Sequence, residues 1–126
     1  MVNIDKHISH WLNGAEEDWE VANQLILSDK IRHGLFFLHL TLEKIIKAHI
    51  CRNTNDIAPK LHNLVRLAEV SGIYFDQTQT DLLAEMNPFN IEGRYPEIWG
   101  AVPSREEADI LIERTGEFFR WLKNQL

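Results

Sequence analysis

The sequence lacks the features that would mark a disulfide-stabilised, secreted or membrane-spanning protein. Its single cysteine, Cys51, excludes an internal disulfide. No apolar run approaches the roughly 20 residues that a membrane-spanning helix needs. The first residues, MVNIDKHISHW, also lack the basic, apolar and small-residue order of a signal peptide. We therefore expect a cytoplasmic protein that does not associate with membranes.

Positive charge is scarce as well. The chain has 13 basic and 19 acidic residues, and its net charge of −6 argues against a general affinity for nucleic acid. The stretch from Lys44 to Ala68 is an exception, with five basic residues and one acidic residue. This patch could face a phosphate-bearing ligand or an acidic partner. Alternatively, its cations could simply suit the C-terminal end of a helix, where the macrodipole favours positive charge.

No segment predicts a pair of strands, whereas apolar residues recur at helical spacing along much of the chain. With 126 residues, 44% of them hydrophobic, the chain is long enough for one domain, residues 1–126, with a genuine core. We predict an all-α fold, an up-and-down helical bundle of four main helices plus one short helix. The predicted helices cover about 5–28, 31–52, 60–71 and 78–87, and the last begins at 104.

Turn and capping residues set the ends of these helices. The short linker at residues 28–30 predicts an antiparallel hairpin of the first two helices. Later boundaries are predicted from Pro59 and Gly72 for the third helix, Thr78 with Asp81 for the fourth, and the capping box of Ser104 with Glu107 for the last. Residues 89–103 have no helical period and hold two glycines and two prolines, which is typical of a functional loop or one packed on itself.

The second predicted helix has the most apolar face in the chain, yet polar residues lie on it. At about 100° per residue, one broad arc holds Leu35, Phe36, Leu38, Leu42, Ile45, Ile46 and Ile50, together with His39, Glu43 and His49. Phe37, Thr41, Lys44 and Lys47 fall outside this arc. Asp18 lies in the same way within the apolar stripe of the first helix. Because a buried carboxylate needs a partner, we expect Arg94 or Lys47 to neutralise Glu43 and Asp18.

These polar residues support two interpretations. In one, Asp18, His39 and Glu43 belong to a structural ion-pair network that fixes how the helices and the loop pack. In the other, polar side chains line a pocket for a phosphate or a base. The predicted ligand-binding residues are Lys44, Lys47, His62, Arg94 and Tyr95.

Other chemistry has weaker support. His7 with His10, and His39 with Glu43, have spacings that can place two metal ligands on one helical face, but such pairs are common by chance. The sequence has no Glu-x-x-His pair, no glycine-rich phosphate loop and no dinucleotide fingerprint. Catalysis by Cys51 would need a neighbouring base. We predict no metal and no cofactor.

Several segments together carry a resemblance to a known family. They are WLNGAEEDWEVANQLI near the N-terminus, HLTLEKIIKAHI around Glu43, LHNLVRLA around His62, the tripeptide Arg94-Tyr95-Pro96, and a final helix after Ser104. In this order and spacing they resemble the HEPN domain family, named for higher eukaryotes and prokaryotes and for nucleotide binding. The resemblance implies a helical bundle that commonly dimerises and operates beside a small nucleotidyltransferase.

The resemblance also implies a division between nuclease and other members. Nuclease members are metal-independent endoribonucleases that use an Arg-x4-6-His motif, usually late in the domain, in a cleft made by two protomers. No histidine follows Arg94 in this sequence. Arg32 and His39 have the residue types and the spacing of the motif, with six residues between them, but they lie at the start of the second helix. We interpret this match as coincidental.

Our hypothesis from sequence is a non-catalytic HEPN-like domain that forms a homodimer. It would bind a nucleotide, an RNA or a small nucleotidyltransferase partner through the basic side of the second helix and the loop at Arg94. The alternative is a toxin-like, metal-independent endoribonuclease that uses Arg32 and His39. Phe37, Ile110 and Trp121 are the candidates for a dimer or partner surface.

Overall fold

The computed structural model describes residues 3–90 and 102–126, and these residues form α-helices and no strand. The helices are α1 (Ile4–Leu27), α2 (Ile31–Thr54), α3 (Leu64–Val70), α4 (Gln77–Met86) and α6 (Arg105–Lys123). The predicted all-α helical fold is confirmed. Within the described ranges, none of the helices combines the length and the apolar content needed to cross a membrane. Arg94 and Tyr95 lie outside the described residues.

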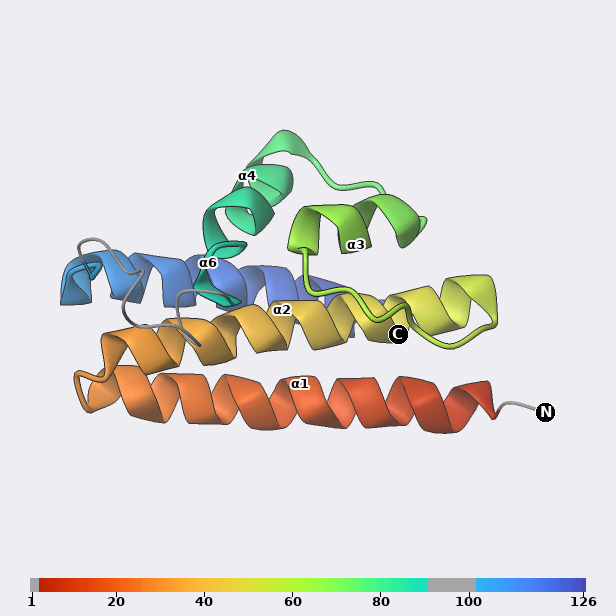
Figure 1. The fold of residues 1–126 in the computed structure, drawn as a ribbon, viewed down its shortest axis with the longest axis horizontal. Coiled ribbons are helices and arrows are strands. Elements are labelled where there is room, and N and C mark those ends of the chain that lie inside the picture. The colour runs from red at the N-terminus through yellow and green to blue at the C-terminus, as the bar shows by residue number, and fades with distance from the viewer. Residues whose placement is uncertain (1–2, 91–101) are drawn as a thin grey trace.

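Helices α1 and α2 form the predicted antiparallel hairpin (Figure 1). The chain reverses at Asp29, which adopts a left-handed conformation with φ of 60°, and the amide of Lys30 donates to the Leu25 carbonyl at 2.8 Å. The two helices approach closely just after the turn, because a Cβ atom added to Gly34 would lie 2.2 Å from Cγ1 of Ile26. The absence of a side chain at position 34 therefore allows the helices to pack.

Helix α6 runs alongside α2 and in the same direction (Figure 1). At its start, Arg105 forms an ion pair of 2.7 Å with Asp29, next to the start of α2. Near its end, Nε2 of His49 lies 2.8 Å from the carbonyl oxygen of Leu122. Contacts at both ends thus fix the alignment of two helices that are far apart in sequence.

Helix α2 is the central element of the bundle. It contacts α1, α3, α4 and α6, and Figure 1 shows it between α1 and the pair formed by α3 and α4. The apolar arc predicted for α2 is confirmed by its buried members, which are Leu35, Leu38, Leu42, Ile45, Ile46 and Ile50. The prediction that Thr41 and Lys47 lie off the core was wrong, since both are buried. Because α2 has neighbours on several sides, its core surface is wider than one arc.

The helix boundaries differ from the predictions in two places. Helix α3 begins at Leu64 rather than near residue 60, because Asn63, not Pro59, provides the cap by accepting from the Arg66 amide at 3.0 Å. Helix α4 is capped by Asp76 rather than Thr78, in a capping box with Gln79. The predicted capping box at the start of α6 is confirmed, and the helix ends agree within a few residues elsewhere. The late start of α3 leaves residues 61–63 outside any helix.

Candidate functional site

The carboxylate of Glu43, in the middle of α2, is the centre of a buried polar cluster. Its side chain is 5% exposed, and Lys47, one helical turn later, places Nζ 3.1 Å from Oε2. His39, one turn earlier and fully buried, has Nδ1 3.7 Å from Oε1. His62 joins these residues from another segment of the chain. The name Glu43 cluster is used below for four residues, Glu43, Lys47, His39 and His62. Of the two partners predicted for Glu43, Lys47 and Arg94, Lys47 fills this role.

His62 connects the Glu43 cluster to the protein surface. Its Nδ1 lies 3.1 Å and 3.2 Å from the two carboxylate oxygens of Glu43, and its side chain is 55% exposed. This contact depends on the late start of α3, since His62 belongs to residues 61–63, which precede the helix. An ionised carboxylate has no hydrogen to donate and acts only as an acceptor. In the contact with ionised Glu43, Nδ1 of His62 therefore carries the hydrogen and donates it. The Nε2 atom remains available on the opposite side of the ring.

Lys47 is held on two sides. Besides Glu43, its ammonium lies over the ring of Trp11 in α1, 5.0 Å from the centroid. Both the carboxylate and the aromatic face stabilise the positive charge in a position where water has little access. The predicted ligand-binding lysine thus lies inside the bundle, where it balances the charge of Glu43.

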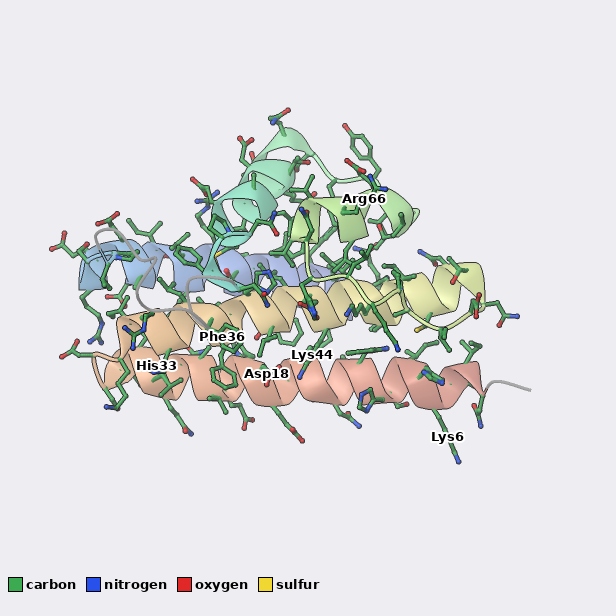
Figure 2. All side chains as sticks on the ribbon, viewed as in Figure 1. Lys6, Asp18, His33, Phe36, Lys44 and Arg66 are labelled. Atoms are coloured by element: carbon green, nitrogen blue, oxygen red, sulfur yellow. The ribbon has the colours of Figure 1, made fainter. Side chains whose placement is uncertain are left out.

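A second ion pair joins α1 to α2. Nζ of Lys44 lies 2.7 Å from a carboxylate oxygen of the buried Asp18, and Figure 2 shows the two side chains between the helices. The predicted position of Asp18 inside the apolar stripe agrees with its burial, but its partner is Lys44 rather than the predicted Lys47 or Arg94. Lys44 is therefore engaged with an acidic side chain, although part of its surface remains exposed.

The geometry gives little support to acid–base chemistry at Arg32 and His39. The two residues lie seven positions apart on α2, which corresponds to about 10 Å along the helix axis. The His39 side chain has no solvent-exposed surface and lies beside Glu43. A general acid or base must reach the proton that it transfers, and in this chain protein atoms surround the His39 ring.

The described residues contain no arrangement suited to a metal ion or a cysteine nucleophile. No group of three His, Cys, Asp or Glu side chains in residues 3–90 and 102–126 is placed to hold a metal. Burial raises the pKa of the Cys51 thiol, which disfavours the nucleophilic thiolate.

A cavity beside His62 was not predicted from the sequence. Its volume is about 370 Å³, and it is lined by His62, Asn63, Asn87, Pro88 and Asn90. We call it the asparagine cavity. The only sequence signal was the clustering of asparagines beside His62 and around Pro88, in HNL and NPFN.

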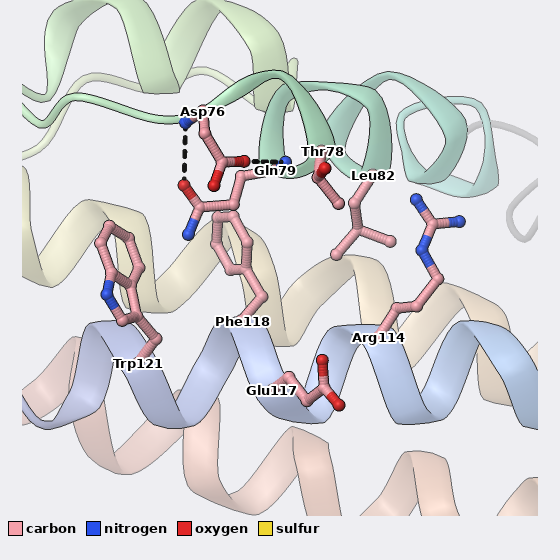
Figure 3. A pocket seen from close by; sticks show the side chains of 8 residues that line it. All are labelled: Asp76, Thr78, Gln79, Leu82, Arg114, Glu117, Phe118 and Trp121. Carbon is pink, nitrogen blue, oxygen red and sulfur yellow. Dashed lines mark hydrogen bonds between the residues drawn. The ribbon is translucent and has the colours of Figure 1, made fainter.

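A second hollow lies between α4 and α6. It measures about 350 Å³ and has Leu82, Phe118 and Trp121 among its lining residues. Figure 3 shows the aromatic rings of α6 facing α4, with the capping box of Asp76 and Gln79 at the rim. Of the three residues predicted for a dimer or partner surface, Ile110 and Trp121 are exposed, whereas Phe37 packs against the core.

Comparisons with known proteins agree with this fold. The model of the HEPN domain family matches residues 8–125, so the chain belongs to the HEPN domain family. No curated protein matches the sequence.

Two solved structures are similar to the chain. TT1696 from Thermus thermophilus has a TM-score of 0.80 at 15% identity, over 94% of this chain and 98% of that one. ST0689, described as an archaeal HEPN homologue, has a TM-score of 0.73 at 20% identity, over 94% and 96% of the two chains. At these identities the likeness shows a shared fold.

Proposed function

We propose that this HEPN domain is a non-catalytic domain that binds a phosphate-bearing ligand, a nucleotide or an RNA, and acts as a homodimer. The observation that carries the proposal is the Glu43 cluster. Three of its members are buried and hold one another, and only His62 reaches the surface. Such a cluster fixes an imidazole at the mouth of a cavity, where its Nε2 can meet a ligand.

The charges support a phosphate ligand over a metal or another cation. The buried negative charge of Glu43 is already balanced by Lys47 at 3.1 Å. Among the described residues, those that line the asparagine cavity carry no carboxylate. The described lining of the cavity therefore adds no negative charge of its own, even though the whole chain is acidic.

Isothermal titration calorimetry with AMP, ATP and a short single-stranded RNA tests ligand binding. We expect at least one of these ligands to bind, and His62→Ala to weaken binding at least tenfold. His33, which is exposed at the start of α2 (Figure 2), provides the matched control His33→Ala. Equal loss of affinity in both variants would contradict a role for the Glu43 cluster.

The hollow between α4 and α6, which we call the α4–α6 groove, and the apolar side chains exposed on α6 support the proposal of a dimer. Trp121 and Ile110 are large apolar residues that remain exposed on α6, and interfaces are enriched in such aromatic side chains. We expect sedimentation equilibrium to give a dimer, and Trp121→Asp to shift it toward monomer. A wild-type protein that stays monomeric at all accessible concentrations would exclude the dimer, and a small nucleotidyltransferase would then be the partner to test on this groove.

The ribonuclease alternative has a direct assay. The purified protein is incubated with RNA in the presence of EDTA, and the products are examined for cyclic phosphate ends. We expect no cleavage. Cleavage that is lost in Arg32→Ala would instead support the toxin-like endoribonuclease.

A further inference from the structure

Four side chains form a line along the outer side of α6. They are Ile110, Arg114, Glu117 and Trp121, and at 100° per residue they fall within an arc of about 60°. Ile110 is 57% exposed and Trp121 is 38% exposed, and Glu117 is exposed between them. Figure 3 shows Arg114, Glu117 and Trp121 following one another along the helix. We call these four residues the α6 stripe.

The α6 stripe has a symmetric order. Its members are apolar, basic, acidic and apolar in turn, at successive spacings of four, three and four residues. The midpoint between Ile110 and Trp121 is therefore also the midpoint between Arg114 and Glu117. On either side of this point an apolar side chain lies at the same distance, and so does a charge, but the two charges have opposite signs. The spacing is that of a heptad, at which two helices pack side by side.

A two-fold axis through this midpoint makes the α6 stripe complementary to itself. In a two-fold interface, a residue that contacts a second residue of the partner is repeated in the reverse sense. An antiparallel second α6 thus places the partner's Glu117 opposite Arg114 and the partner's Trp121 opposite Ile110, and each contact occurs twice. A parallel arrangement would instead place arginine opposite arginine and glutamate opposite glutamate, which is unfavourable.

We infer that the α6 stripe binds the α6 stripe of a second copy of this chain, antiparallel and about a two-fold axis between Arg114 and Glu117. The charge complementarity of the stripe with its own reversed copy carries the inference. It rests on the proposed function, because it assigns the interface of the proposed dimer to particular residues and a particular symmetry.

Hollows at both ends of the α6 stripe suit the same arrangement. The α4–α6 groove lies beside Trp121. A smaller hollow of about 260 Å³ lies beside Ile110 and has Phe89, Pro103 and Leu111 among its lining residues. The antiparallel arrangement brings the partner's Ile110 to the first hollow and the partner's Trp121 to the second. The apolar side chain at each end of the stripe therefore meets an apolar surface.

Arg114 already has a partner in its own chain, Glu85 of α4. The Arg114 side chain is 32% exposed and that of Glu85 is 54% exposed, and ion pairs with this degree of exposure contribute little to stability. A guanidinium group carries five N–H donors. Pairing with Glu85 therefore leaves Arg114 with donors for a second carboxylate, that of the partner's Glu117.

The test reverses the two charges separately and then combines them. Arg114→Glu alone places like charges opposite each other at both central contacts of the dimer, and so does Glu117→Arg alone. In a mixed dimer with one copy of each variant, the new glutamate faces the new arginine, and the unchanged Glu117 faces the unchanged Arg114. Both contacts are then attractive again. Only an antiparallel pairing of these two positions predicts this recovery.

Sedimentation equilibrium measures the dimer dissociation constant of each protein and of the equimolar mixture. We expect each single variant to dimerise at least about tenfold more weakly than the wild type, and the mixture to recover most of this loss. Arg66→Glu on α3 and Glu20→Arg on α1 provide matched controls, because they reverse the same charges at exposed positions of other helices. Neither control variant, nor their mixture, should change the dissociation constant.

Two results would overturn the inference, and only one of them also removes the proposed dimer. If the wild type dimerises and the single variants dimerise equally well, or if their mixture shows no recovery, the dimer uses another surface and only the inference fails. If the wild type is monomeric, both fail. Should Arg114→Glu be unstable beside Glu85, the same exchange is made in a Glu85→Gln background, which removes that repulsion.

Discussion

Replacing Lys47 with methionine tests whether the Glu43 cluster is a buried ion-pair network. Methionine keeps an unbranched apolar stem of similar length, so packing near Trp11 is largely retained while the charge is lost. Both Lys47 and Glu43 have side chains only 5% exposed. Removing one partner of a buried pair costs ~3–5 kcal/mol, because the remaining charge is left poorly solvated. His62 still donates to Glu43, so we expect a cost near the lower end, about 3 kcal/mol.

A double-mutant cycle separates this pairing from the loss of packing. Glu43→Gln should also lower the free energy of unfolding, because the ammonium of Lys47 then lacks its counter-charge. In the variant with both changes, Glu43→Gln and Lys47→Met, no uncompensated charge remains in the cluster. The double variant should therefore be less destabilised than the sum of the single variants, by about 2 kcal/mol.

Urea unfolding followed by tryptophan fluorescence measures these free energies. The comparison is made at pH 7.5 with all four proteins under the same conditions. If the two single effects simply add, or if Lys47→Met costs under about 1 kcal/mol, the cluster is not a coupled buried network. The premise that it holds His62 in place would then fail as well.

Three further substitutions test other parts of the structure. Gly34→Ala should lower the free energy of unfolding, because overpacking against Ile26, 2.2 Å from the new Cβ, costs ~1–3 kcal/mol and the gain in helix propensity is at most ~1 kcal/mol; urea unfolding measures the difference. His49→Gln should weaken the dependence of stability on pH. Burial lowers the pKa of His49 in the folded state below its ordinary value of 6.5. The stability that neutral His49 contributes is therefore complete above pH 6.5 and is lost as the pH falls from 6.5 toward the lowered pKa. Urea unfolding across this pH window measures the loss. Ser104→Ala should cost ~1 kcal/mol through loss of the α6 cap, while Ser104→Asp should restore most of that stability.

Each of these substitutions has a control and a contrary outcome. Gly14→Ala adds a methyl group whose nearest neighbour, at 3.1 Å, is a flexible lysine side chain, so it should be neutral or stabilising. Equal effects at Gly14 and Gly34 would argue against the close approach at the hairpin. The substitution His33→Gln, at an exposed position of α2, provides the control for a histidine change. An unaltered dependence of stability on pH in His49→Gln would contradict the lowered pKa of His49. No loss of stability in Ser104→Ala would show that the cap contributes little.

The helices themselves were predictable because apolar spacing and local capping chemistry are properties of short segments. Ser104 with Glu107 defined the start of α6 correctly. Asn63 and Asp76 were missed as caps because Pro59 and Thr78 offered equally plausible local signals. Such choices depend on contacts from outside the segment. The Leu64 amide at the start of α3, for example, donates to Asn87 at the end of α4.

The candidate site was predictable only in part. A helical wheel correctly placed Glu43 and Asp18 among apolar residues, and burial then required partners for them. The wheel cannot tell how many neighbouring helices surround α2, so Lys47 was placed on an outer face although it is buried. Nor could it show that residues 61–63 lie outside any helix, in the segment from which His62 reaches Glu43. The asparagine cavity depends on the meeting of the α3 and α4 ends and had little sequence signal.

The central position of α2 has a consequence for how the bundle assembles. Its contacts with α1 join segments separated by a short turn, so they form with a small entropy of loop closure, whereas α3, α4 and α6 must be brought in across longer stretches of chain. We expect the α1–α2 hairpin to form early and to exchange its amide hydrogens most slowly in the native state. Glu43 and Lys47 belong to this early unit, but His62 and the three asparagines do not. The asparagine cavity would thus be among the last parts of the protein to form and the first to be lost when the outer helices open, while the hairpin stays folded.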